Sequence, residues 1–277
     1  MKNRKEILSN FPYIIWVLFY AFLFWLIFGA TMESLQIVVV IYAVSLILAC
    51  TPVAEWLWRM VSGVRKLATL EEKDRLLPLF GEVYEDALKI DGNLFKNIEL
   101  CTQDSMEINA FAFGQRTLIL TRGAIEMLDD EALKGIIAHE FGHFSHYDTV
   151  VTLFAHISNI LMGIFLKFVY GITKTLMFIA RNKDPIIGTT LKIFYKIVIG
   201  IYKAIVFIGD LILMPVSRKH EHLADIFATK CGYGKNLIYS LYQLRQISLS
   251  EPTKLIEQLR STHPPLVKRI EVLENLK

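Results

Sequence analysis

Cysteine is scarce in this sequence. Cys50, Cys101 and Cys231 are odd in number, lie far apart and form no CxxC pair. The pattern argues against a disulfide framework and gives no support to a zinc site built from thiolates. A reducing compartment that faces the cytosol fits these three cysteines best.

Charge of either sign is also sparse. Asp, Glu, Lys and Arg make up 21% of the 277 residues, and the formal net charge is +3. Because no long basic run and no nucleic-acid-binding motif occurs, we expect no DNA or RNA partner. Hydrophobic residues instead make up 53%, and the mean hydropathy is +0.41. A soluble domain needs more charge to cover its surface, so this composition indicates contact with a lipid bilayer.

Two long uncharged runs open the chain, residues 11–30 and 35–54. Each is as long as the ~20 residues that a helix needs to cross the hydrocarbon core. The link between them is short, which favours a transmembrane hairpin over a cleaved signal sequence. Lys and Arg flank the outer ends of the pair, whereas the link contains Glu33 and no basic residue. Both ends of this hairpin are therefore predicted to lie in the cytoplasm.

Residues 69–148 have the mixed charged and apolar character of a folded aqueous block. The pattern predicts a helix over 71–89 and short strands over 97–101 and 117–120, which indicate a small sheet. Two aspartates at 129–130 then supply the capping chemistry with which a further helix begins.

That further helix contains the motif HEFGH at residues 139–143. Helix positions four apart differ in direction by only ~40°, so His139 and His143 project from one face and can bind the same metal ion. Imidazole nitrogens suit zinc, and a site with three protein ligands leaves a fourth position for water. Glu140 lies one step around the helix, near enough to act as general base on that water. Unless the motif is a chance match on a helix face, it predicts metal-dependent peptide hydrolysis.

The third ligand has to be found elsewhere. The extended metalloprotease motif places a glycine and a third histidine after the second histidine, but His146 and Thr149 occupy those two positions. His146 follows His143 on the same rigid helix, where three ligands would spread along the axis and suit a tetrahedral site poorly. A carboxylate from another helix is the better candidate.

The segment SRKHEHLAD at residues 217–225 offers such a carboxylate. Glu221 can bind the metal, while Asp225, one turn later on the same face, can hydrogen-bond a ligating imidazole from outside. His220 and His222 point elsewhere on that helix and would become ligands only if the helix were rotated differently.

Four segments in this order resemble peptidase family M48, closest to its bacterial HtpX-like branch: NAFAFG at 109–114, HEFGH at 139–143, SRKHEHLAD at 217–225 and STHPPLVKRI at 261–270. The resemblance implies proteolysis of membrane or misfolded proteins at the cytoplasmic face, with one zinc ion per chain. By the same resemblance His139, His143 and Glu221 are the zinc ligands, Glu140 is the base, and Asp225 is the supporting carboxylate.

The resemblance also assigns residues that composition and spacing do not. It implies a strand that pairs with extended protein or peptide substrates, formed by Asn109, Ala110, Phe111 and Ala112. His263 and Arg269 match family positions that face the metal and stabilise an oxyanion. Without the resemblance, His263 before two prolines would be a turn residue, and Arg269 a charge on a helix surface.

Residues 150–216 between the two halves of the site are harder to place. The run 150–166 is long enough to enter a bilayer, but five lysines then interrupt the apolar sequence: Lys167, Lys174, Lys192, Lys196 and Lys203. At helical pitch they fall on two stripes, so they either snorkel, face a water-filled cleft, or mark helices that protrude from the membrane or lie on its surface. Pro215 is a possible end or kink of the last of these helices.

Together these features predict a mainly α membrane protein with transmembrane helical hairpins and a cytosolic α+β zincin-like catalytic domain that contains a small β-sheet. We expect a multi-pass protein of a bacterial inner or plasma membrane. Its expected parts are an N-terminal hairpin over 1–54, catalytic segments over 55–149 and 217–277, and a membrane-associated hairpin over 150–216.

The expected function is zinc-dependent endoproteolysis in protein quality control. The alternatives are a signalling or processing protease with one dedicated substrate, and a catalytically silent zinc-containing scaffold. The eukaryotic prenyl-protein proteases of the same family have additional spans that enclose a chamber. At most four spans can be drawn in this sequence, so prenyl-peptide processing is a minor alternative.

Overall fold

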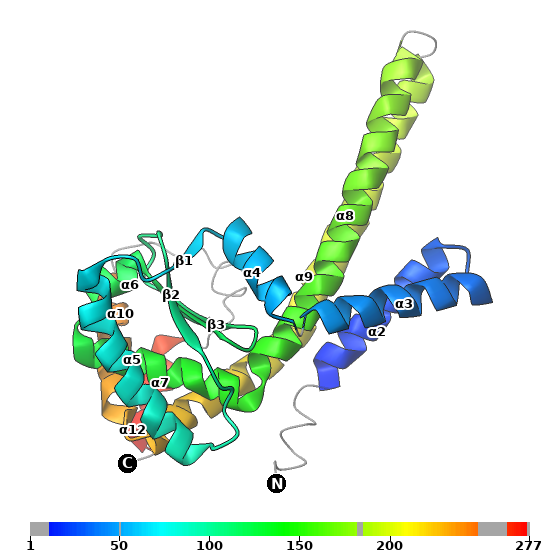
Figure 1. Cartoon of the computed structure of the whole chain (residues 1–277). Helices are drawn as coiled ribbons and strands as arrows, with labels where there is room; N and C mark the ends of the chain where they lie inside the picture. Colours follow the sequence, from blue (N-terminus) through cyan, green and yellow to red (C-terminus); the bar gives the residue numbers. More distant parts are fainter. Residues whose placement is uncertain (1–10, 50, 182–184, 249–264, 276–277) are drawn as a thin grey trace.

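The two uncharged runs at the start of the chain fold as a helical hairpin (Figure 1). Its helices are α2 (Phe11–Ile27) and α3 (Met32–Ala49). Gly29 and Ala30 reverse the chain between them with positive φ angles of 97° and 55°. The computed structural model describes four stretches of the chain: residues 11–49, 51–181, 185–248 and 265–275.

A second, much longer hairpin projects away from the rest of the molecule (Figure 1). It consists of α8 (Asp148–Arg181) and the larger part of α9 (Pro185–Lys230). The first hairpin packs beside its base, where Tyr20 and Phe24 of α2 join Met162 and Leu166 of α8 in a buried apolar cluster. The five lysines that interrupt the apolar sequence are exposed: Lys167, Lys174, Lys192, Lys196 and Lys203.

The helix lengths correct part of the membrane prediction. Among the described residues, one segment is long and apolar enough to cross a membrane, Ile160–Ile179, with 20 residues and a mean hydropathy of 1.5. Helices α2 and α3 are apolar but have 17 and 18 residues, fewer than the uncharged runs. They are shorter because residues 28–31 form the turn and Pro52 starts a separate helix, α4 (Pro52–Val61).

Helix α9 also differs from expectation. It does not end at Pro215 but continues to Lys230, so one helix runs from the tip of the second hairpin to Glu221 and Asp225. The boundary expected between residues 216 and 217 is therefore not a boundary between elements of secondary structure.

The aqueous block is built around a four-stranded mixed sheet with the order β1-β2-β4-β3. Strand β2 (Glu99–Gln103) pairs in parallel with β4 (Thr117–Thr121), and both outer pairings are antiparallel. The outer strands are β1 (Val64–Lys66) and β3 (Ala110–Phe113). Within the described residues, one side of strand β3 therefore pairs with no other strand.

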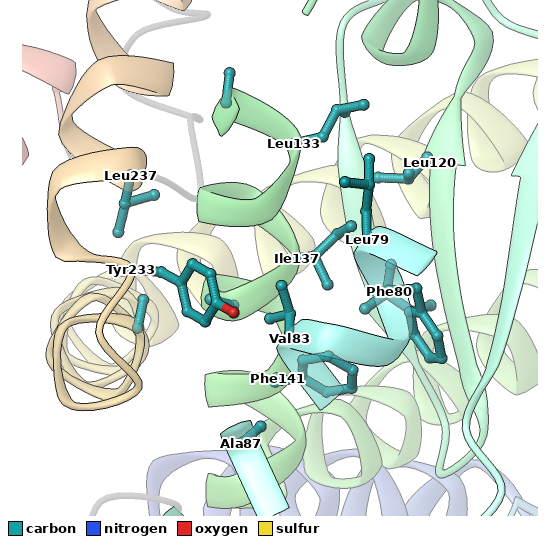
Figure 2. Close-up of a cluster of buried hydrophobic side chains, with 14 of the residues drawn as sticks. Leu79, Phe80, Val83, Ala87, Leu120, Leu133, Ile137, Phe141, Tyr233 and Leu237 are labelled. Carbon is teal, nitrogen blue, oxygen red and sulfur yellow. The ribbon is translucent and has the colours of Figure 1, made fainter. Parts of the chain in front are cut away.

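One apolar core joins the sheet to the helices around it. Figure 2 shows α7 (Asp130–His146) between α5 (Leu70–Ile90) on one side and α10 (Gly234–Ser248) on the other. Ile137 and Phe141 of α7 are fully buried in this core. Two short helices complete the block, α6 (Arg122–Met127) and α12 (Leu266–Asn275).

Two glycines allow α7 to approach its neighbours closely. A Cβ atom added to Gly135 would collide with the backbone of α10 at Asn236 and Leu237. A Cβ added to Gly142 would lie 2.6 Å from the Cα atom of Ala224 in α9. Because Gly142 precedes His143 and Ala224 precedes Asp225, the second contact sets the spacing between the two halves of the candidate site.

Candidate metal centre

Helix α7 begins and ends at well-defined caps. The side chain of Asp129 accepts a hydrogen bond from the Ala132 N–H at 2.9 Å, which satisfies one of the free donors of the first turn. The helix ends at Tyr147, which has a left-handed conformation with φ of 61° and turns the chain into α8 at Asp148. HEFGH at residues 139–143 lies in the C-terminal half of the helix between these two caps.

The structure brings His139, His143 and Glu221 together, with one ligand atom from each inside a group whose atoms all lie within 4.8 Å of one another. The Nε2 atom of His139 lies 3.5 Å from Oε2 of Glu221, and Nε2 of His143 lies 3.4 Å from Oε1. Neighbouring ligands of a tetrahedral zinc ion are separated by about 3.4 Å, given metal–ligand bonds of about 2.1 Å. The donor set and its spacing therefore fit zinc.

A second observation supports this fit. His139 is 4% exposed, and within the described residues its Nε2 atom has no hydrogen-bond partner. Buried polar atoms normally have partners, so a nitrogen left bare beside a carboxylate is the expected arrangement for a ligand that binds a cation.

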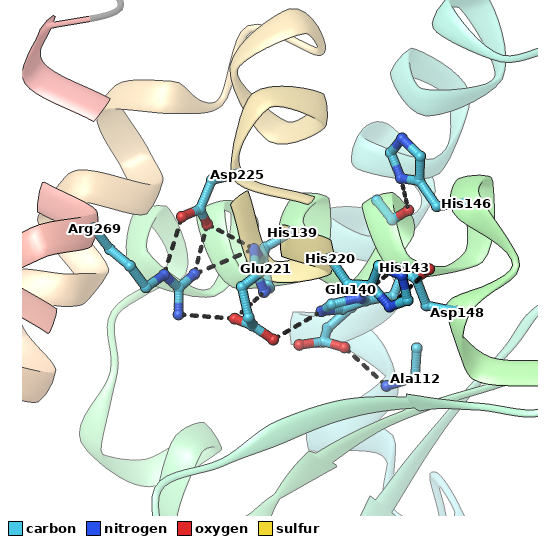
Figure 3. A network of polar contacts seen from close by, with 11 residues as sticks. Ala112, His139, Glu140, His143, His146, Asp148, His220, Glu221, Asp225 and Arg269 are labelled. Carbon is cyan, nitrogen blue, oxygen red and sulfur yellow. Dashed lines mark hydrogen bonds and ion pairs between the residues drawn. The ribbon is translucent and has the colours of Figure 1, made fainter. Parts of the chain in front are cut away.

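The opposite ring nitrogen of His139 is held by a buried carboxylate. Its Nδ1 atom lies 2.9 Å from Oδ1 of Asp225. Arg269 in α12 donates to both oxygens of Asp225, at 3.0 Å and 2.6 Å, and its third nitrogen lies 3.3 Å from Glu221 (Figure 3). Such two-pronged pairing fixes orientation as well as charge, so Asp225 and Arg269 hold both a ring and a carboxylate in place.

This placement gives Arg269 a different role from the one that the resemblance implied. Its guanidinium group is occupied by Asp225 and Glu221 instead of being free for an oxyanion. His263, the other residue assigned to that role, lies outside the described residues.

Asp148 is a site residue that the sequence reasoning missed. It is 4% exposed, and its Oδ2 atom lies 3.2 Å from Nδ1 of His143. Its other oxygen lies 3.2 Å from Nδ1 of His220, whose ring stacks on Tyr13 of α2. Each histidine of HEFGH thus has its own carboxylate on the side away from the metal position, the arrangement that sets tautomer and orientation.

Three other histidines whose side chains the structure describes, His146, His220 and His222, do not belong to the ligand cluster. His146 directs its Nδ1 atom to the carbonyl oxygen of Gly142, at 2.7 Å, within its own helix. His222 is exposed. His220, although adjacent to Glu221, contacts Asp148 and Tyr13 and does not belong to the three-residue metal cluster.

Glu140 lies between the metal cluster and the sheet. Its side chain is buried, and Oε2 accepts a hydrogen bond from the backbone N–H of Ala112 at 2.8 Å (Figure 3). Because this N–H belongs to the edge strand β3 and points away from β4, the outer side of the strand faces the Glu140 carboxylate. Asn109 lies just before the strand, where its side-chain oxygen accepts from the N–H of Ala110.

The pKa values of the buried histidines and of Asp225 are shifted by the opposite charges beside them. Burial lowers the pKa of His143, but the carboxylates of Asp148 and Glu221 raise it well above its usual value. Burial and Arg269 lower the pKa of His139, yet Asp225 and Glu221 leave it raised overall. Burial raises the pKa of Asp225, which His139 and Arg269 nevertheless hold below its usual value. Without a metal the imidazoles therefore attract protons, and metal binding must displace them.

Two histidines and a glutamate that fit a metal ion, with a second glutamate beside them, define the centre of a metal-dependent hydrolase. The model of Peptidase family M48 matches residues 86–277. The chain is 28% identical over 248 residues to a protein named Protease HtpX homolog from Bacteroides fragilis, covering 78% of this chain and 72% of that one. The protein of the same name from Bacillus subtilis is 26% identical over 252 residues, covering 80% and 78%.

A solved structure agrees at the level of the fold. The crystal structure of S. mikatae Ste24p matches with a TM-score of 0.52 and 19% identity, covering 98% of this chain and 66% of that one. The chain belongs to peptidase family M48. The resemblance to its HtpX-like branch, inferred from four short motifs, is thereby confirmed.

Proposed function

We propose that this protein is a membrane-bound zinc endopeptidase that cleaves membrane or misfolded proteins at the cytoplasmic face. The observation on which the proposal rests is the position of Glu140, beside the His139–His143–Glu221 cluster and hydrogen-bonded to the edge strand. A scaffold that had lost catalysis would not need a base in this position. The quality-control role follows from the family resemblance alone.

The three ligands would hold one zinc ion, which supplies a Lewis acid that polarises a peptide carbonyl and acidifies water. Asp225 and Asp148 keep the two imidazoles oriented, each through a ring Nδ1 atom. Arg269 offsets the negative charge of Glu221 and Asp225 within the buried site.

Glu140 moves the protons. Its Oε2 atom is fixed by the Ala112 N–H, which leaves Oε1 to accept a proton from the attacking water. The same oxygen then donates that proton to the amine that leaves when the peptide bond breaks. The charge of a carboxylate is needed in the first step, and an amide cannot accept a proton in its place.

Strand β3 is the proposed substrate platform. Its pairing partner β4 covers one side only, so an extended peptide can add to the other side by backbone hydrogen bonding. Ala112, the last residue of the segment 109–112, donates its backbone N–H to Glu140, and a strand bound there would present its backbone to the base. Recognition through backbone groups suits unfolded substrates of varied sequence, because it reads little of the side chains.

The test is cleavage of an unfolded model protein by the purified chain and by Glu140→Gln, with and without a chelator. The glutamine keeps an oxygen for the Ala112 N–H but cannot take a proton, so it should retain zinc and fold while turnover falls by at least about 10²-fold. Glu131→Gln, an exposed change on the same helix, is the matched control and should cleave normally. Undiminished cleavage by Glu140→Gln would refute the assignment.

A further inference from the structure

Helix α4 has two faces of opposite character. Four apolar side chains at helical spacing share one face, and each is between 51% and 63% exposed: Val53, Trp56, Leu57 and Met60. The opposite face contains Glu55, Trp58 and Arg59, which are buried or half-buried. Ten residues with this division form an amphipathic helix whose apolar side meets nothing within the described chain.

The opposite face of α4 contacts the end of β3, the turn that follows it and the start of β4. Oxygens of the Glu55 side chain accept from the Gln115 N–H at 2.7 Å and from the Thr117 hydroxyl at 2.9 Å. The Trp58 ring stacks on Phe113, the last residue of β3, with 3.8 Å between ring centres. The helix is thus attached to the substrate side of the sheet through both charge and ring contacts.

The turn between β3 and β4 is closely packed against α4. Gly114 has a φ angle of +60°, and a Cβ atom there would collide with the carboxylate of Glu55. The carbonyl oxygen of Gly114 accepts a hydrogen bond from Thr149 of α8 at 2.5 Å. The turn is therefore held between α4 and α8, and movement of α4 must move the end of β3.

The position of α4 in the chain indicates what its apolar face meets. It starts three residues after α3 ends, and no charged residue lies between Glu33 and Glu55. Thr51 is extended, with φ of −96° and ψ of 151°, and Pro52 opens the new helix, so α4 leaves the direction of α3. An amphipathic helix with an outward tryptophan, joined directly to an apolar helix, is typical of the layer between lipid tails and headgroups.

We propose that the apolar face of α4 lies in the interfacial layer of the bilayer and thereby fixes the edge strand β3 close to the membrane surface. This inference rests on the membrane attachment in the proposed function. It narrows the substrate class to protein segments that leave the membrane, or lie against it, within reach of β3. Because Glu55 and Trp58 on the opposite face of α4 contact the β3–β4 region, the depth of α4 in the lipid layer determines how far β3 lies from the membrane.

The test uses the four tryptophans of the chain. Two full-length variants keep a single tryptophan, either Trp56 or Trp58, and have phenylalanine in place of the other three. Their fluorescence is measured in vesicles whose lipids contain bromine near the headgroup end of the acyl chains. Trp56 should lose most of its fluorescence and Trp58 little. A third variant, Leu18→Trp without the native tryptophans, is measured in vesicles whose lipids contain bromine near the ends of the acyl chains. It reports whether α2 is in the bilayer, because Leu18 is 62% exposed in the middle of that helix.

The outcomes separate the two proposals. If Leu18→Trp is quenched but Trp56 is not, the chain is in the membrane and the inference about α4 is wrong. Shielding of Trp56 from a water-soluble quencher without quenching by brominated lipid would assign the face to a protein contact and would also overturn it. If Leu18→Trp is not quenched, the membrane attachment itself fails.

A functional arm remains informative if a tryptophan variant does not fold. Leu57→Glu should slow cleavage of a bilayer-anchored substrate while leaving cleavage of an unfolded soluble protein in detergent unchanged, because the charge cannot enter the lipid layer. Leu77→Glu, at a similarly exposed leucine of α5, is the matched control and should change neither rate. Equal behaviour of the two variants would overturn the inference, whereas a wild-type chain that cleaves neither substrate would refute the proposed function.

Discussion

The substitution Gly142→Ala tests whether the contact between α7 and α9 sets the metal geometry. The added Cβ atom would lie 2.6 Å from Cα, 2.9 Å from Cβ and 3.0 Å from the carbonyl oxygen of Ala224. Carbon atoms in contact need about 3.5–4.0 Å, so the two helices must separate locally by about 1 Å. Backbone atoms cannot turn aside as a flexible side chain would.

A shift of this size matters because the ligands lie on the two helices. His143 follows Gly142 on α7, and Glu221 lies one turn before Ala224 and Asp225 on α9. Metal–ligand distances tolerate only about 0.2 Å, so we expect Gly142→Ala to bind zinc much more weakly. Overpacking should also lower the free energy of unfolding by about 1–3 kcal/mol.

The assay is the zinc content of the purified protein after dialysis against graded chelator, together with thermal unfolding and peptide turnover. Gly135→Ala is the matched control, because it lies seven residues earlier on the same helix and collides with α10 instead of α9. It should destabilise the fold to a similar extent but keep its zinc affinity. Equal zinc affinity in Gly142→Ala and wild type, or equal loss in both variants, would refute the reasoning.

Five further substitutions have defined outcomes. Glu221→Ala should lose zinc, which metal analysis measures, and full occupancy would mean that another residue is the third ligand. Arg269→Ala leaves buried carboxylates without their cation, so chemical denaturation should show that the free energy of unfolding falls by about 3–5 kcal/mol. His263→Ala should instead lower kcat by ~10²-fold to 10³-fold and leave the free energy of unfolding unchanged. Asp148→Asn should weaken zinc binding by about 10–100-fold in a chelator titration. The hydrogen bond from Arg65 lowers the pKa of Glu72 from 4.5 to about 2. The ionised Glu72 therefore stabilises the fold above pH 4.5, and this stabilisation is lost as the pH falls toward 2. The melting temperatures of wild type and Glu72→Gln should converge in acid.

The parts of the site that sequence could predict are those defined by local spacing. Helix α7 was expected from the aspartates at 129–130 and from its apolar period, and the structure starts it there. The common face of His139 and His143 follows from helix geometry alone. Glu221 was chosen because a second helix offered a carboxylate, and the structure places it within reach of both rings.

The parts that sequence could not predict depend on long-range contacts or on single backbone angles. Asp148 reaches His143 only because Tyr147 adopts a left-handed conformation, which no residue type at that position demands. Arg269 meets Asp225 across 44 positions of sequence, and no periodic pattern records that contact. The uncharged run over residues 35–54 predicts one continuous span, because hydropathy does not register the break between α3 and α4. Pro52, a residue that commonly opens a helix, is the local sign of that break.

The unbroken course of α9 restricts how chains of this fold can change in length. This helix has 46 residues and is about 69 Å long, and it joins the projecting hairpin to Glu221 without a joint. Inserting one residue between the two would rotate the hairpin by about 100° around the site, whereas seven residues would restore the original face to within about 20°. Proteins of this fold whose projecting hairpins differ in length should therefore differ by insertions of about two helical turns, present in both α8 and α9.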